Sequence, residues 1–484
     1  MTEHYDVLII GAGISGIGMA CHLARECPQK SFAILERRQA IGGTWDLFRY
    51  PGIRSDSDMM SFGYQFRPWT DTRILADGPS IRRYVNETAS EHGVDRQVKF
   101  GLRTVSADWS SRTARWTVTA IAEDSGAART FSCDYLITAT GYYNHDQGYL
   151  PEFNGAESFK GRCVHPQHWP EDLDYQGRRV VVIGSGATAV TLLPAMAGET
   201  AHITMLQRSP SYVYSLPATD RMAGMLRRLL PERWVYTLSR RRNIGLQRFV
   251  YKASRRFPGQ MRSLLLSAVR RQLGSDFDMA HFTPRYMPWD ERLCAVPDGD
   301  LFRVIREGKA SVVTGHIERF TEQGILLKSG EVLEADIIIT ATGLQLQTVG
   351  GMTLSVDGET RTLSERMTYK GVLVQDMPNL AYLFGYTNIS WTLKIDMTAG
   401  YVCRLLNEMD RRNASAVTPR APAAAMQDDS ILGSLQSGYV QRGDSALPRQ
   451  GRDLPWRVLH HFEKDRAMFR RPVDDAALKW QPRR

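Results

Sequence analysis

Cysteine is scarce in this sequence, and its spacing forms no pair. The six cysteines in 484 residues include no Cys-x-x-Cys; they are Cys21, Cys27, Cys133, Cys163, Cys294 and Cys403. Without such pairs, we expect neither a metal site nor a disulfide framework, and a disulfide reductase lacks the redox cysteines that it needs. The scattered thiols predict a reducing, cytoplasmic location.

Long apolar runs and a leader pattern are also missing. No run of 18 uncharged apolar residues occurs, so no membrane-spanning helix is expected. The chain enters a strand pattern within its first residues, without the basic, apolar and small-residue regions of a signal peptide. With 43% hydrophobic and 23% charged residues, the chain is expected to be globular. Its length predicts about two to four domains.

Acidic residues are nearly absent from residues 221–271. Thirteen arginines and Lys252 stand against Glu232 alone, a net charge of +13 within a chain whose net charge is +9. Such a segment is most often a solvated helical surface. Two functional interpretations stay open, which are contact with an anionic membrane surface and contact with cofactor phosphates. No nucleic-acid partner is predicted, because no motif of a nucleic-acid-binding module is present.

A dinucleotide-binding pattern opens the chain. The apolar run 7–10 predicts a strand buried on both faces, and Gly-Ala-Gly-Ile-Ser-Gly follows at residues 11–16. A helix over 17–26 and a strand over 32–35 that ends in Glu36 complete the pattern. The glycines allow a tight turn and a close approach of pyrophosphate, and Glu36 can accept hydrogen bonds from a ribose diol. The candidate contacts are Gly11, Gly13, Ser15, Gly16 and Glu36.

The acidic ribose partner favours FAD or NAD in this first unit, because it would repel a 2′-phosphate. A Gly-Gly turn at residues 42–43 follows, as it does in flavoproteins with two dinucleotide sites, where it runs along the flavin. For Arg54 and Asp56, a surface ion pair is the alternative to a cofactor contact. Further candidates for cofactor binding are Gly43, Thr44, Trp45, Asp46, Leu47, Arg54, Ser55, Asp56 and Thr104.

A second dinucleotide pattern begins at the apolar strand 179–183 and ends at Arg208. Arg208 occupies the position that Glu36 holds in the first unit. An arginine can pair with a 2′-phosphate, which favours NADPH, although a surface arginine is the alternative. The candidate contacts are Gly184, Ser185, Gly186, Ala187, Thr188, Ala189, Gln207 and Arg208.

These patterns predict an α/β fold with two Rossmann-like dinucleotide-binding domains and a helical insertion. A strand ending in Ala-Thr-Gly recurs at residues 139–141 and 341–343, at each expected return to the flavin unit. The expected domains are FAD-binding (1–143 and 344–484), NADPH-binding (150–216 and 291–343) and a helical insertion in the latter (217–290). Pocket walls are expected from the insertion and from residues 388–394.

Between the two loops lies Phe159-x-Gly161-x-x-x-His165-x-x-x-Trp169-Pro170. Together with both glycine-rich loops, this stretch resembles the type I Baeyer–Villiger monooxygenases, which are FAD- and NADPH-dependent relatives of the flavin-containing monooxygenases. The resemblance extends over essentially the whole chain. It implies that His165 belongs to a linker that keeps the two nucleotide domains in register, and that this histidine is not a chemical base.

The resemblance also assigns the active site. Asp56 and Arg292 would face each other over the flavin, and the NADPH contacts would be Arg54, Ser55, Gln207 and Arg208. Many members carry a lysine just before the active-site arginine, where it helps to hold the 2′-phosphate. This sequence has Glu291 at that position, which leaves Arg208 as the main phosphate partner.

The implied reaction takes a hydride from NADPH and forms a C4a-peroxyflavin with O2. Attack of this species on a ketone gives an ester or a lactone, and its protonated form oxygenates sulfides or thioamides. A fixed guanidinium such as that of Arg292 is suited to stabilising the peroxide anion. Two alternatives stay open, an S/N-oxygenating flavin monooxygenase without Baeyer–Villiger activity and a non-enzymatic flavin-binding sensor. The sequence does not predict an oligomeric state.

Overall fold

The computed structural model describes residues 2–291, 293–422, 425–432 and 437–483. Its first sheet is built around β1, which pairs in parallel with β2 and β6. The strand order is β20 (Glu359–Thr360), β19 (Thr353–Val356), β4 (Leu102–Ser110), β5 (Arg115–Ala122), β6 (Ala128–Thr138), β1 (Glu3–Ile10), β2 (Phe32–Leu35) and β3 (Val98–Lys99). From β6, a branch continues through β23 (Leu380–Tyr382), β22 (Leu373–Val374) and β21 (Thr368–Tyr369).

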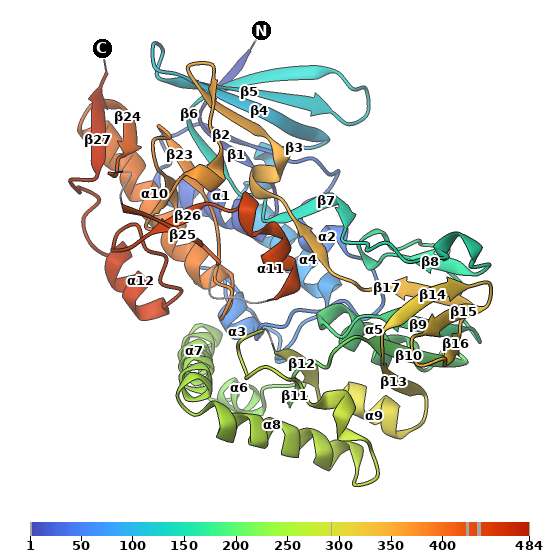
Figure 1. The fold of residues 1–484 in the computed structure, drawn as a ribbon. Coiled ribbons are helices and arrows are strands. Elements are labelled where there is room, and N and C mark those ends of the chain that lie inside the picture. The colour runs from blue at the N-terminus through green and yellow to red at the C-terminus, as the bar shows by residue number, and fades with distance from the viewer. Residues whose placement is uncertain (1, 292, 423–424, 433–436, 484) are drawn as a thin grey trace.

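Three helices accompany the first sheet, α1 (Ile14–Glu26), α4 (Gly78–Glu91) and α10 (Thr392–Arg411). Helix α1 begins at Ile14 rather than at the predicted residue 17, because Gly13 is its N-cap and the glycine-rich turn forms its first turn. Helix α10 packs against α1 although the two are far apart in sequence (Figure 1). The first glycine-rich loop is therefore held between this sheet and its helices.

The second sheet consists of parallel strands in the order β13 (Ala310–Thr314), β10 (His202–Gln207), β9 (Arg179–Ile183), β17 (Ile337–Thr340) and β8 (Arg162–Val164). Helices α5 (Ala187–Met196) and α9 (Asp300–Arg306) pack beside it, and β14 (Ile317–Thr321), β15 (Gly324–Leu327) and β16 (Val332–Glu334) form a small antiparallel sheet. The predicted α/β class with two parallel sheet cores is confirmed.

The chain crosses between the two sheets through a short strand pair that the sequence patterns did not predict. Strand β7 (Tyr143–Gly148) pairs in antiparallel register with β18 (Leu344–Leu346). Each strand directly follows one of the two Ala-Thr-Gly segments. The two crossings are thus tied to each other by backbone hydrogen bonds.

Within residues 217–290 lie α6 (Arg221–Leu226), α7 (Glu232–Arg256) and α8 (Pro258–Leu273), drawn in green at the bottom of Figure 1. Beside them, β11 (Val213–Leu216) pairs with β12 (Cys294–Pro297). Apolar residues at helical spacing predicted this helical segment, yet these residues are not its buried face. Leu229 is 80% exposed and Trp234 is 61% exposed, whereas Val235 and Arg240 are buried. Among the described residues, no helix is long and apolar enough to span a bilayer.

The part of the chain after Asn413 returns to the first sheet and then to the middle of the molecule. Its elements are β24 (Ala414–Pro419), β25 (Met426–Ser430), α11 (Gly438–Gly443), β26 (Arg449–Gly451), α12 (Phe462–Phe469) and β27 (Leu478–Pro482). Strands β24 and β27 pair with each other, and so do β25 and β26. The described residues of this region pack against the rest of the protein, as its aromatic residues predicted.

Candidate active site

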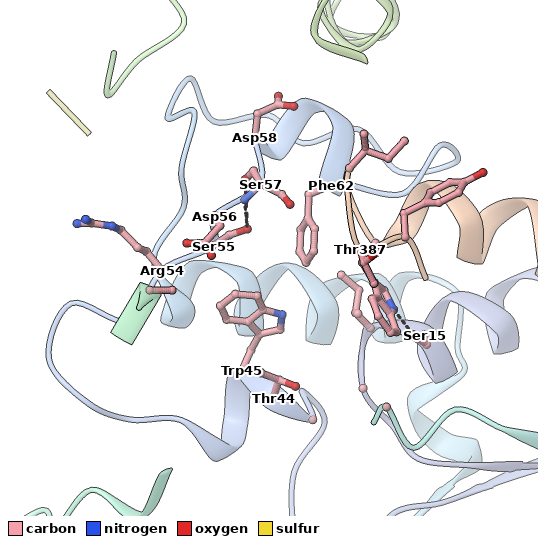
Figure 2. Close-up of a pocket in the computed structure, with 18 of the residues that line it drawn as sticks. Ser15, Thr44, Trp45, Arg54, Ser55, Asp56, Ser57, Asp58, Phe62 and Thr387 are labelled. Carbon is pink, nitrogen blue, oxygen red and sulfur yellow. Dashed lines mark hydrogen bonds between the residues drawn. The ribbon is translucent and has the colours of Figure 1, made fainter. Parts of the chain in front are cut away.

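A cavity of about 1230 Å³ is bordered by the first glycine-rich loop, residues 54–58, the crossing strand β7, helix α7 and residues 386–391 (Figure 2). This volume exceeds the roughly 300–1000 Å³ of typical small-molecule pockets. It therefore has room for a dinucleotide together with a substrate.

The first glycine-rich loop has the geometry of a phosphate cradle. Gly11 has φ +104°, and a Cβ there would lie 2.8 Å from the carbonyl oxygen of Ala139. A Cβ at Gly16 would overlap the carbonyl oxygen of Gly11. A side chain at Gly11 would push the loop away from Ala139, and one at Gly16 would push the start of α1 away from the loop. The loop thus keeps its bare backbone at the cavity wall, beside the start of α1, where N–H groups face outward.

Glu36 lies at the end of β2 and lines the same cavity. One carboxylate oxygen accepts a hydrogen bond from the Ala12 backbone N–H at 2.7 Å, and the other accepts one from the Arg38 N–H at 2.8 Å. Burial raises the pKa of Glu36, and the two N–H groups oppose this rise. The carboxylate is therefore fixed in position, and each oxygen keeps a lone pair that can accept a ribose hydroxyl.

The predicted flavin-side contacts fall into two groups. Gly43, Thr44 and Trp45 line the cavity, and so does Thr104, whose hydroxyl is buried without a hydrogen-bond partner in the described structure. Gly43 and the short helix α2 (Thr44–Leu47) form this wall. Two other predicted contacts have protein partners. Asp46 forms ion pairs with Arg38, Arg49 and Arg82, and Leu47 packs in the core of the second sheet.

Residues 54–57 form the opposite wall, close to the start of α3 (Met59–Phe62) (Figure 2). The Arg54 Nη1 lies 2.7 Å from the Asp300 carboxylate, whereas its Nε and Nη2 are buried without partners in the described structure. Ser55 accepts a hydrogen bond from the Ser57 N–H at 3.0 Å. Two unsatisfied guanidinium donors at a cavity wall are costly unless an anion meets them, which fits a nucleotide phosphate.

Asp56 also lines the cavity, near Tyr214. Burial raises the pKa of the Tyr214 hydroxyl, and the negative charge of Asp56 raises it further. Arg292, the predicted partner of Asp56, lies outside the described residues. Trp289 and Leu293, its near neighbours in sequence, both line the cavity.

The second glycine-rich loop repeats the close approach of the first. Gly184 has φ +133°, and a Cβ there would overlap the carbonyl oxygen of Ala341. Ala187 lines the cavity, and Ala189 is buried in the core of the second sheet. Ser185 donates a hydrogen bond to the Ser209 carbonyl at 3.1 Å. Gly186 has open space around it. Burial raises the pKa of the Tyr50 phenol, and a hydrogen bond with Thr188 opposes this rise. The loop leaves room for a second dinucleotide.

At the end of β10, the two predicted NADPH contacts differ in exposure. The Gln207 amide is buried and donates to the His281 carbonyl at 2.7 Å and to the Thr314 hydroxyl at 2.9 Å. Arg208 is exposed. Burial raises the pKa of Glu291, and the positive charge of Arg208 opposes that rise. The two side chains therefore lie near enough for their charges to interact.

His165 directly follows β8, packs against the end of the crossing strand β7 and is not among the cavity-lining residues. Its Nδ1 accepts a hydrogen bond from the Gln167 N–H at 3.2 Å, and a Cβ at Gly148 would overlap the imidazole ring. Burial lowers the pKa of His165, while the backbone of Gly343 opposes this. A neutral imidazole thus sits between β7 and the start of β18.

Two aromatic cavity residues were not predicted individually. Trp391, in the predicted wall 388–394, donates its indole N–H to the Ser15 hydroxyl at 2.8 Å and stacks on Tyr142 at 5.3 Å between ring centroids. His145, on β7, also lines the cavity, and burial lowers its pKa to about 4. No local motif marks these residues, because each reaches the cavity through long-range packing.

Comparison with known proteins gives consistent matches. Residues 4–349 match a family model described as "Flavin-binding monooxygenase-like". The chain is 60% identical to MymA of Mycobacterium tuberculosis over 99% of its own length and 98% of that protein, and 51% identical to the FAD-containing monooxygenase EthA of the same organism over 100% and 99%. A solved structure of oxidized steroid monooxygenase bound to NADP has a TM-score of 0.80 at 23% identity and covers 99% of this chain and 100% of its own.

Proposed function

Since this chain belongs to the flavin-binding monooxygenase-like family, we propose that it is an FAD- and NADPH-dependent monooxygenase that converts ketones to esters or lactones, with S-oxygenation of sulfides or thioamides as a second activity. The observation that carries the proposal is that the first glycine-rich loop and Ala187 of the second loop, together with Arg54 and Asp56, line one cavity. Such a cavity lets a nicotinamide reach a flavin and leaves a place for the substrate beside them.

FAD is proposed to bind along the first loop. Glu36 would accept the ribose hydroxyls, and the unpartnered hydroxyl of Thr104 would gain a hydrogen bond. The wall of Gly43, Thr44 and Trp45 would flank the ring system. NADPH is proposed to bind at the second loop, with Arg54 and Arg208 as phosphate partners, because the spare donors of Arg54 need an anion.

The proposed domain division follows the two sheets. Residues 1–143 and 344–484 would form the FAD-binding domain, and residues 150–216 and 291–343 the NADPH-binding domain, with 217–290 as a helical insertion. In support, the strands of the first sheet come from the first pair of ranges and those of the second sheet from the second pair. Leu246 and Met261, on the helices of the insertion, help to line the cavity.

Catalysis is proposed to depend on Arg292 and Asp56. When bound, FAD and NADPH supply hydride transfer and oxygen activation. A guanidinium stays charged at any physiological pH, so Arg292 would stabilise negative charge on oxygen during attack on a carbonyl. Asp56 would position that guanidinium. His165 would act on neither substrate nor proton, and would instead keep the crossing strands in register.

The direct test is Arg292→Ala, with Arg285→Ala as the matched control, because Arg285 is an exposed arginine nearby in sequence. We expect the Arg292 variant to let NADPH bleach the flavin under anaerobic conditions, while ester formation falls about 10²–10³-fold. Near-normal ketone oxidation by this variant would show that the assignment is wrong. Product analysis with one ketone and one sulfide separates this enzyme from a pure S/N-oxygenase, and a sensor would not consume NADPH.

Peripheral contact of the insertion with an anionic membrane is the second proposal. Several large apolar side chains of the insertion are exposed in a segment with many arginines, namely Met225, Leu229, Trp234, Leu238, Phe249, Phe257 and Leu264. Apolar side chains next to basic ones suit the boundary between lipid headgroups and acyl chains. Outside the insertion, Leu150 is similarly exposed, at 57%.

Co-sedimentation with vesicles tests this contact. We expect binding to vesicles that contain anionic lipid at low salt, and weaker binding at high salt or with zwitterionic lipid. Replacing Trp234 and Phe249 together by serine should reduce binding, whereas Leu150→Ser, the control, should leave it unchanged. Absence of binding at low salt would rule the membrane contact out.

A further inference from the structure

Helix α11 brings one arginine of the C-terminal region to the second dinucleotide unit. The helix lies in the middle of the molecule, far from the paired strands β24 and β27 (Figure 1). It packs on the crossing strand β18, and its Val440 is buried in a core that also contacts Leu346. This packing anchors the helix, so the side chain of Arg442 starts from a fixed backbone.

Arg442 points at the segment that closes the second dinucleotide loop. Its guanidinium carbon lies 3.6 Å from the centroid of the Tyr149 ring. Its Nη2 lies 3.4 Å from the position that a Cβ on Gly343 would occupy. Gly343 ends the Ala-Thr-Gly segment, and Ala341 of that segment is in contact with Gly184 of the glycine-rich loop. Stacking on the ring holds the guanidinium plane and leaves its edge free to donate hydrogen bonds.

The charged groups around Arg442 favour the binding of an anion. Among the described residues, no carboxylate forms an ion pair with Arg442. Burial lowers the pKa of Arg442, Tyr149 opposes this, and the positive charge of Arg208 lowers the pKa further, so the two guanidiniums repel each other. The carboxylate of Glu291 lies near Arg208 and offsets part of that positive charge. Two arginines that repel each other beside one carboxylate are stabilised when a multiply charged anion binds.

We propose that Arg442, together with Arg208, binds the 2′-phosphate of NADPH. This inference rests on the proposed function and adds to it a specificity-determining residue from the C-terminal region. The second positive charge compensates for Glu291, whose carboxylate would otherwise weaken binding of a dianionic phosphate next to Arg208. The region after Asn413, to which the sequence assigned no role, would then help to select NADPH over NADH.

Equilibrium titration of the flavin-loaded protein with NADP⁺ and with NAD⁺ tests the proposal. For Arg442→Gln, we expect the Kd for NADP⁺ to rise about 10–100-fold, as for loss of one charge-assisted contact, and the Kd for NAD⁺ to stay unchanged. Arg442→Lys should lie between the variant and the wild type, because it keeps the charge but not the planar fork. Arg452→Gln is the control, since Arg452 is an exposed arginine of the same region.

The ratio of the two dissociation constants decides the outcome. Equal weakening of NADP⁺ and NAD⁺ would overturn the proposal, because it would mean a contact with the shared diphosphate or a structural role. Unchanged binding of both nucleotides would overturn it as well. If the wild-type protein binds neither nucleotide, the proposed function itself fails, which this design distinguishes from failure of Arg442 alone. Retention of flavin by each variant verifies that it is folded.

Discussion

The imidazole of His165 lies against the backbone of Gly148, so closely that a methyl group at position 148 would overlap the ring. Gly148 ends β7, and His165 also meets the backbone of Gly343, just before β18. One side chain therefore contacts the end of β7 and lies near the residue that precedes β18. A change in the relative position of these two segments would alter this contact.

His165→Ala should leave FAD binding unchanged and should couple NADPH oxidation poorly to oxygenation. The ring does not line the cavity, but without it the end of β7 loses a packing partner. Coupling is measured as oxygenated product formed per NADPH consumed, with hydrogen peroxide as the expected by-product.

Gly148→Ala provides the complementary change, since it retains the imidazole but displaces it. It should uncouple the enzyme in the same direction as His165→Ala. His316→Ala serves as the control, because His316 is an exposed histidine near the second sheet. Full coupling in both the His165 and Gly148 variants would contradict the proposed role of this contact.

Arg54→Gln should raise the KM for NADPH by about 10–100-fold while FAD remains bound. The change removes the two buried donors that lack protein partners and also leaves the Asp300 carboxylate unpaired. Steady-state kinetics with varied NADPH measures the effect. Arg49→Gln is the matched control, since Arg49 pairs with Asp46 on the outer side of the loop. An unchanged KM would place the nucleotide phosphates elsewhere.

Glu36→Ala should release FAD. The variant loses the acceptor for ribose hydroxyls, and it leaves the Ala12 N–H without its 2.7 Å partner. A buried unsatisfied donor of this kind costs about 1–3 kcal/mol. Flavin absorbance of the protein after gel filtration measures retention, and Glu36→Gln, which keeps acceptor capacity, should retain more flavin than Glu36→Ala. Equal flavin retention by both variants would show that an acceptor oxygen at residue 36 does not determine FAD binding.

Stability should depend on pH through His22, which joins α1 to α10. Burial opposes its charge, yet contacts with Asp396 and Glu26 raise its pKa from 6.5 to about 9. Because the folded-state pKa is raised, this stabilisation is complete below about pH 6.5 and is lost as the pH rises toward 9. A shift of that size corresponds to about 3 kcal/mol at most.

Urea unfolding of the wild type and of His22→Gln measures this stabilisation. The difference in unfolding free energy between the two should be largest at about pH 6 and should shrink as the pH approaches 9. His316→Gln, at an exposed site, should show no such trend. A difference that stays constant over this range would exclude protonation of His22 as the cause.

The structure differs from the sequence-based expectation in residues 217–290 and at strands β7 and β18. Apolar residues at helical spacing indicated the helices of residues 217–290, but Leu229 and Trp234 face outward. Periodicity reports which residues share a helix face, and it does not report whether another element covers that face. Strand β7 was missed because its sequence, YNHDQG, is polar and lacks an apolar strand pattern, and β18 was missed because it has only three residues.

The sequence by itself determined the two glycine-rich loops, the acid at Glu36, the arginine at Arg208 and the α/β class. Those features are local, because a backbone that must approach a phosphate admits only small residues at fixed spacing after a buried strand. The tertiary structure alone decided that Trp391 holds Ser15, that Arg54 keeps two unpaired donors, that His165 meets Gly148 and that Arg442 reaches Gly343. Each of these contacts joins residues from different elements, and only the packing of the sheets brings them within reach of each other.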